Sequence, residues 1–169
     1  MEKKVIVIGG GWSGIAAAVA AKKCGADVTI VEKTDLMLGL GNVGGIMRNN
    51  GRFTATEENI ALGADELFAI TDRCSRHVNI DFPGHKHASL YDVIKVEPQV
   101  RRLLMEQGIE VLTIARGVDV EMEKGGPDGK SAVMKSVSLA DGWVVYGDAF
   151  IETTGSTGPM GNCLTYGNG

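Results

Sequence analysis

Three glycines near the amino terminus have the spacing of a phosphate-binding turn. Gly9, Gly11 and Gly14 form a GxGxxG pattern directly after the apolar run Val5 to Ile8. In such a turn the first glycine allows the bend, the second lets the backbone approach a pyrophosphate, and the third lets helix and strand touch. The N–H groups and the positive end of the helix dipole would bind a dinucleotide pyrophosphate without a side-chain cation.

Glu32 supplies the second chemical group of this pattern. A carboxylate at this place, about twenty residues beyond the glycines, accepts hydrogen bonds from ribose hydroxyls and disfavours a 2′-phosphate. GxGxxG alone is a weak signal, because glycines also serve ordinary turns. A strand, glycines, a helix, a second strand and a terminal acid in this order favour dinucleotide binding.

The elements that must position these residues form a βαβ unit. Val5 to Ile8 is a β-branched run suited to a parallel strand that is buried on both faces. An alanine-rich helix follows, which Gly25 can end in the left-handed conformation, and Asp27 to Val31 is the second strand. The predicted fold class is therefore α/β, with a Rossmann-like parallel sheet.

Composition limits the classes of function. The 169 residues suit one domain, and a net charge of -4 gives no basic field for nucleic acid and no polybasic membrane patch. Cys24, Cys74 and Cys163 are widely separated and odd in number, so neither disulfides nor a zinc quartet is indicated. No apolar run reaches the length of a signal core or membrane span, so we expect a cytoplasmic protein. We also expect a small-molecule substrate.

The middle of the chain gives weaker signals. Residues 33–53 are rich in glycine and predict a long loop beside a ligand, or alternatively a flexible surface connection. Residues 54–74 predict one helix that opens with a Thr54/Glu57 capping box. Residues 75–90 look irregular and hold all three histidines, and a solvated loop explains His85 and His87 better than a metal site does.

The second half of the chain predicts one more helix and then strands. Pro98 suits the first turn of the helix, which Gly108 would end. Residues 109–146 predict a three-stranded antiparallel excursion. A strand over 149–152 returns to the parent sheet and runs into a second glycine-bearing turn, while residues 155–169 form an irregular tail. The whole chain, 1–169, is thus expected to be one incomplete domain, without a final strand or helix to complete its sheet.

This order of parts resembles the amino-terminal portion of FAD-dependent oxidoreductases of the glutathione-reductase-like superfamily, which have two dinucleotide-binding domains. The first motif is Val5 to Gly14 with Glu32, and the second is Phe150-Ile-Glu-Thr-Thr-Gly155, similar to the family's ATG motif. Thr153 stands where alanine is commoner. The resemblance covers nearly the whole chain and implies FAD as the cofactor.

The resemblance also implies roles for particular residues. The GxGxxG glycines would hold the FAD pyrophosphate, Glu32 the adenosine ribose and the Val118 backbone the adenine, while Gly44 and Gly45 would lie near the pyrophosphate and flavin. The implied cofactor-binding residues are Gly9, Gly11, Ser13, Gly14, Glu32, Lys33, Gly44, Gly45, Arg48, Val118, Thr154 and Gly155. No metal site and no catalytic residue is identified.

Family members continue into a second half that completes the flavin site. We therefore expect this chain to be either one subunit of a split flavoenzyme, with a partner chain, or a fragment of a longer protein. Its function would be the FAD-binding portion of an oxidoreductase that transfers hydride or electrons to or from a small molecule. A non-catalytic flavin-binding or assembly subunit is the alternative, and an NAD-binding module would leave the Thr154-Gly155 motif unexplained.

Two further side chains are candidates for chemistry. Arg48 would tune the flavin or hold a substrate carboxylate, or it is simply a solvated loop arginine. An Arg48→Ala protein with unchanged flavin potential and turnover would exclude both functional roles. Cys163 would be a redox thiol or, more simply, an inert one, because no second cysteine stands at CxxC spacing.

Overall fold

A four-stranded parallel sheet forms the centre of the computed structural model, which describes residues 2–50, 56–83, 85–125 and 131–155. Its strand order is β10-β1-β2-β6. β1 is in the middle and pairs Ile6 with Phe150 of β10 and with Thr29 of β2. The strands are β1 (Lys4–Ile8), β2 (Asp27–Val31), β6 (Glu110–Leu112) and β10 (Ala149–Glu152). The α/β fold class with a Rossmann-like sheet is confirmed.

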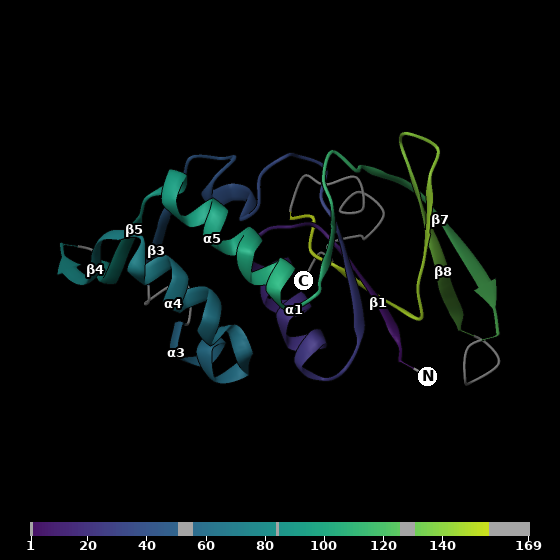
Figure 1. Ribbon diagram of the computed structural model, residues 1–169, viewed down its shortest axis with the longest axis horizontal. Helices are drawn as coiled ribbons and strands as arrows, with labels where there is room; N and C mark the ends of the chain where they lie inside the picture. The colour runs from purple at the N-terminus through teal and green to yellow at the C-terminus, as the bar shows by residue number, and fades with distance from the viewer. Residues whose placement is uncertain (1, 51–55, 84, 126–130, 156–169) are drawn as a thin grey trace.

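The two faces of this sheet are covered by different layers. Side chains alternate along β1. Val7 packs with the helices, while Ile6 and Ile8 pack on the opposite face, toward an antiparallel sheet within residues 117–146. Figure 1 shows these layers, with the helices on one side of β1 and β7 and β8 on the other. The helices are α1 (Trp12–Lys23), α3 (Thr56–Asn59), the π-helix η2 (Ile60–Ala64), α4 (Asp65–Arg73), α5 (Val93–Glu106) and the 3₁₀ turn η1 (Gly39–Gly41).

The predicted antiparallel excursion is present. It is a three-stranded sheet of β7 (Gly117–Lys124), β8 (Ala132–Leu139) and β9 (Val144–Tyr146). Val120, Val137 and Val145 lie in one cross-strand row and turn toward the parallel sheet. The segment 109–122 is shared between two sheets, because β6 belongs to the parallel one. Residues 126–130, between β7 and β8, lie outside the described residues.

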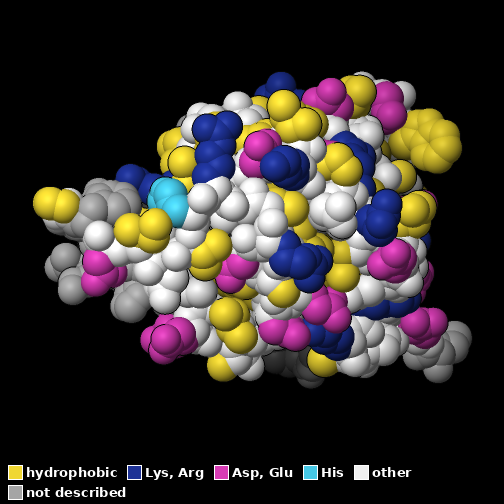
Figure 2. Space-filling view, turned by 60° about the vertical axis from the view of Figure 1, so that its left-hand side comes forward, with side chains coloured by type: hydrophobic (Ala, Val, Ile, Leu, Met, Phe, Trp, Pro, Cys, Tyr) yellow, Lys and Arg dark blue, Asp and Glu magenta, His cyan; other side chains and the backbone are white. Residues whose placement is uncertain are grey.

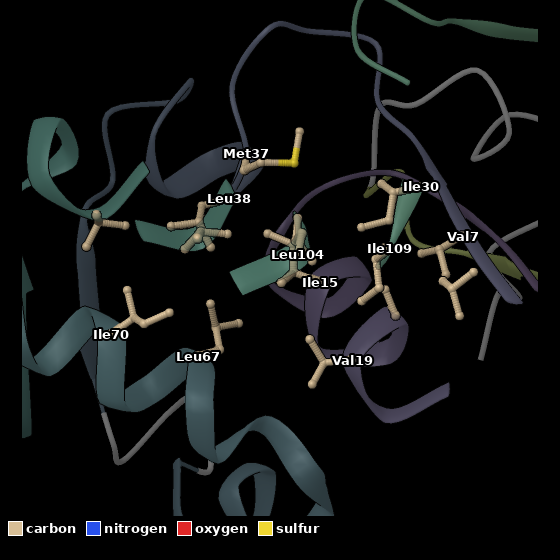
Figure 3. Packing of buried hydrophobic residues seen from close by; sticks show 14 of the residues in the cluster. Val7, Ile15, Val19, Ile30, Met37, Leu38, Leu67, Ile70, Leu104 and Ile109 are labelled. Carbon is tan, nitrogen blue, oxygen red and sulfur yellow. The ribbon is translucent and has the colours of Figure 1, made fainter. Parts of the chain in front are cut away.

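The helical side of the core also anchors a loop. Figure 3 shows Met37 and Leu38, from the segment after β2, in one cluster with Ile15 of α1 and Leu104 of α5. Met37 and Leu38 are both fully buried. Burying two large apolar side chains of a loop contributes roughly 3–6 kcal/mol and fixes its path.

Residues 75–90 are not irregular, contrary to the sequence-based expectation. β4 (Ser75–Phe82) and β5 (His85–Tyr91) form an antiparallel pair, to which β3 (Arg48–Asn50) adds a third strand in the order β3-β5-β4. The β4–β5 pairing contains three register shifts. Each irregularity breaks the two-residue alternation by which a strand is recognised in a sequence, which explains the wrong prediction.

The single helix predicted over 54–74 is also wrong in part. Gly63 has φ +107, and the chain here passes from α3 through η2 into α4. Leu67 of α4 is buried, whereas Ile60 and Leu62 are 40% and 79% exposed. A left-handed glycine rotates the apolar residues before it away from those after it. Thr54 of the predicted capping box lies outside the described residues.

The helix expected to begin at Pro98 begins five residues earlier. α5 starts after Asp92, whose carboxylate accepts a hydrogen bond from Ile94 N at 3.1 Å. Pro98 is inside the helix, where its missing N–H removes one backbone hydrogen bond. Gly108, with φ +67, follows the end of the helix as predicted. In the part of the chain that the structure describes, no helix is both long and apolar enough to cross a membrane.

Candidate cofactor-binding site

A cavity of about 780 Å³ opens at the carboxyl edge of the parallel sheet. Its walls come from the ends of β1, β2 and β10, from the start of α1 and from the loop after β2. This is the edge at which open α/β sheets bind ligands. The predicted site residues that line it are Gly9, Gly11, Ser13, Glu32, Lys33, Gly44, Arg48, Thr154 and Gly155.

The GxGxxG glycines have different structural roles. A Cβ on Gly9, which has φ +110, would lie 2.6 Å from the carbonyl oxygen of Thr153. A Cβ on Gly14 would overlap the carbonyl oxygen of Gly9, so these two glycines allow α1, β1 and β10 to touch. A Cβ on Gly11 would have no atom within 4 Å and would project into open space beside the cavity.

The first turn of α1 offers backbone donors to this cavity. Gly11 is the N-cap residue, no side chain caps the helix, and its first turn contains no acidic residue. Gly11, Trp12 and Ser13 all line the cavity. Uncapped N–H groups and the positive end of the dipole suit a doubly negative pyrophosphate, so these residues fit that part of FAD.

Glu32 is held in place by three hydrogen bonds within the chain. One carboxylate oxygen, Oε2, accepts from Gly10 N at 2.6 Å, while Oε1 accepts from Thr34 N and Thr34 Oγ1 at 2.7 and 2.9 Å. The side chain is nearly buried yet lines the cavity. A carboxylate has about four acceptor sites, so one remains for a ribose hydroxyl. Glu32 therefore fixes the turn as well as facing the ligand.

Thr153 explains the departure from the ATG motif. Its hydroxyl Oγ1 lies 2.9 Å from both the Ile8 and the Gly9 carbonyl oxygens, which share its single O–H donor, and its backbone N donates to Ile8 O at 2.8 Å. Alanine could not make the side-chain bonds. The threonine thus ties the end of β10 to the glycine turn, and Thr153, Thr154 and Gly155 all line the cavity.

An aromatic cluster forms another part of the cavity wall. The indole N–H of Trp12 donates to the hydroxyl of Tyr91 at 3.0 Å, and the Trp12 ring lies 5.1 Å from that of Phe68. Burial raises the pKa of the Tyr91 phenol, although the Trp12 hydrogen bond opposes this, so the hydroxyl stays protonated at neutral pH. Nothing in the sequence links these residues, because Trp12 and Tyr91 come from separate elements.

A substitution at Gly41 tests how tightly this cluster is packed. A Cβ there would overlap the Tyr91 hydroxyl oxygen and would lie 3.3 Å from Trp12 Nε1. We expect Gly41→Ala to lower the free energy of unfolding by about 1–3 kcal/mol, as overpacking does. Tyr91→Phe removes the overlapped oxygen, so Gly41→Ala should cost less in that background. Equal costs in both backgrounds, measured by urea denaturation, would contradict this packing.

Three predicted residues do not line the cavity. Gly14 lies beneath the turn, Gly45 follows the lining residue Gly44, and Val118 is 57% exposed on β7 while Gly117 beside it lines the cavity. Cys163 lies outside the described residues, which contain no group of three or more His, Cys, Asp or Glu suited to a metal ion. Of the lining residues that sequence reasoning did not single out, Gly39 and Gly41 lie in the glycine-rich segment predicted beside a ligand, and Thr34 stands two residues after Glu32.

The sequence matches a protein family over residues 4–167, that of glucose inhibited division protein A. No curated protein sequence matches the chain significantly. Solved structures share its fold at low identity. FqzB has a TM-score of 0.64 at 17% identity, over 99% of this chain and 39% of that one.

Two further structures have comparable similarity. 2-Methyl-3-hydroxypyridine-5-carboxylic acid oxygenase has a TM-score of 0.63 at 16% identity, with 94% of this chain and 41% of that chain covered. Thermovibrio ammonificans THI4 has a TM-score of 0.61 at 18% identity, with 92% and 58% covered. The chain thus spans less than two thirds of the length of each of these structures.

Proposed function

The chain belongs to the glucose inhibited division protein A family, a family of FAD-binding domains, and from this premise we propose that it forms the FAD-binding part of an oxidoreductase. This oxidoreductase exchanges hydride or electrons with a small molecule. The observation that carries the proposal is the uncapped start of α1 inside the cavity, next to Glu32. FAD supplies the redox chemistry, and the chain binds and orients it.

In this proposal, different residues bind different parts of FAD. The N–H groups at Gly11, Trp12 and Ser13 bind the pyrophosphate, and Glu32 accepts a hydrogen bond from the adenosine ribose. Gly117 is supported as the neighbour of the adenine, in addition to Val118, because it lines the cavity. Lys33, Gly44, Gly45, Thr154 and Gly155 are proposed to contact the rest of FAD, and Arg48 is proposed to act at its flavin end.

The substrate side of the site is proposed to come from outside the described residues. The chain spans 39%, 41% and 58% of the three structures compared above. Either further sequence or a partner chain would complete the active site of the single domain 1–169. The cytoplasmic location stays a prediction from cysteine usage and the lack of a signal-like run.

Titration of the purified chain with FAD and with NAD tests the choice of dinucleotide. In a Trp143→Phe variant Trp12 is the only tryptophan, and Trp143 is 71% exposed, so the substitution disturbs little. FAD should quench Trp12 emission at a ratio of one per chain, with NAD at least about tenfold weaker. Tighter binding of NAD would replace this proposal with that of an NAD-binding module.

A further inference from the structure

An ion pair on α5 reaches across to the loop that follows β2. Arg101 Nε lies 2.6 Å from Glu97 Oε1, one helical turn away, and Glu97 is only 9% exposed. The same Glu97 oxygen accepts a hydrogen bond from Met37 N at 3.3 Å, and Arg101 Nη2 donates to the backbone oxygen of Asp35. Both charged side chains are therefore bonded to the backbone of residues 35–38, here called the 35–38 segment.

The 35–38 segment in turn lies against the glycine turn. Leu38 N donates to Gly10 O at 2.8 Å. A Cβ on Gly10 would lie 3.1 Å from the sulfur of Met37, and one on Gly39 would lie 3.2 Å from Gly11 Cα. The path of this segment thus sets the space around the backbone of Gly10, and the residue that follows it, Gly39, sets the space around Gly11.

The segment holds a backbone conformation that requires support. Leu38 has φ +72 and ψ +9, in the left-handed region that costs a residue with a side chain about 1–2 kcal/mol. Such a conformation persists where the surroundings determine it. Burial of Leu38 and Met37 supplies one restraint, as Figure 3 shows, and the α5 ion pair supplies a second on the residues just before.

We propose that Glu97 and Arg101 are positioning residues for FAD binding. They contact no part of the cavity themselves, since neither is among its lining residues within the described chain. They act by holding the 35–38 segment against Gly10, which keeps the turn and the start of α1 in the geometry that receives the pyrophosphate. The inference has two halves. The ligand half, the effect on FAD binding, rests on the proposed function. The structural half, the restraint of the 35–38 segment by Glu97 and Arg101, concerns the chain alone.

Substitutions on one face of α5 test the ligand half. Arg101→Ala and Glu97→Ala should each raise the FAD dissociation constant about tenfold. Together they should cost little more than either alone, because both act through one network. Glu97→Gln keeps an acceptor for Met37 N and should have a smaller effect. Arg102→Ala is the matched control, since Arg102 is exposed on the same helix, whereas the bonds from α5 to the segment come from Glu97 and Arg101.

Limited trypsin digestion without FAD tests the structural half. Cleavage after Lys33, which is exposed and just precedes the segment, should become several-fold faster in Arg101→Ala and Glu97→Ala than in Arg102→Ala, at equal melting temperature. FAD affinities equal to that of Arg102→Ala would overturn the positioning role, whatever the cleavage rates. If the wild-type chain binds no FAD, the proposed function fails. Faster cleavage in the variants would then support the hold on the segment, and unchanged cleavage would overturn it.

Discussion

Replacing Gly14 by alanine is expected to destabilise the chain by about 3 kcal/mol or more, although alanine is the better helix former. A glycine inside a helix normally costs about 1 kcal/mol relative to alanine, so propensity alone predicts stabilisation. The added Cβ would overlap the Gly9 carbonyl oxygen and lie 2.7 Å from Thr153 Oγ1. Backbone atoms of the turn cannot move aside without separating α1 from β1.

Urea denaturation followed by circular dichroism measures this effect. Gly11→Ala is the matched control, because its Cβ would meet no atom within 4 Å. Gly11→Ala should keep the free energy of unfolding of the wild-type chain to within about 0.5 kcal/mol. A Gly14→Ala chain as stable as Gly11→Ala would show that α1 and β1 do not make the close approach described above.

Replacing Glu32 by alanine is expected to weaken FAD binding about 100-fold. The substitution removes the acceptor proposed for the ribose hydroxyl. It also leaves Gly10 N and Thr34 N without their carboxylate partner, so the turn that receives the pyrophosphate loses its support. Two consequences of one change thus act on the same ligand.

Glu152 offers an internal control for this prediction. Its Oε1 accepts a hydrogen bond from Thr154 N at 2.7 Å, the same local arrangement that Glu32 makes with Thr34. Glu152 is not among the described residues that line the cavity, and its carboxylate bonds to Thr154 rather than to the glycine turn. Glu152→Ala should therefore weaken FAD binding far less. Equal losses of FAD affinity in the two variants would remove the special role of Glu32.

Most of the parallel sheet could be predicted from sequence because three of its four strands carry a local signal. The β-branched run of β1, the strand β2 and the strand β10 all lie where the sequence placed them, within one residue, whereas β6 was assigned to the antiparallel excursion. Burial of β1 and β2 on both faces leaves continuous apolar runs that are easy to recognise. The glycine turn and its acid follow directly from the positions of these strands.

The strands β4 and β5, which lie between α4 and α5 in the chain, could not be predicted in the same way. β4 and β5 pair through register shifts, so neither strand shows a regular alternation. Pro98 indicated a helix start, but Asp92, which accepts the hydrogen bond from Ile94 N, supplies the cap six residues before it. A polar residue before an apolar run was the better signal for that boundary.

The non-local contacts of the site were also beyond sequence reasoning. The Trp12–Tyr91 hydrogen bond and the contacts of Glu97 and Arg101 with the 35–38 segment join residues distant in the chain. Charged residues on a helix suggest a solvated face, and Arg102 is indeed exposed. Figure 2 shows basic and acidic side chains interspersed on one face of the molecule, so charge pattern alone does not single out the pair that holds the loop.

The affinity of the Gly11→Ala chain for FAD, relative to wild type, tests the central claim most directly. The new methyl group would stand where the pyrophosphate is proposed to approach the start of α1, yet among the described residues beyond its chain neighbours it would have no atom within 4 Å. We expect the dissociation constant to rise at least about tenfold while the melting temperature without FAD stays unchanged. Equal affinities in two equally stable proteins would contradict the placement of the cofactor at this turn.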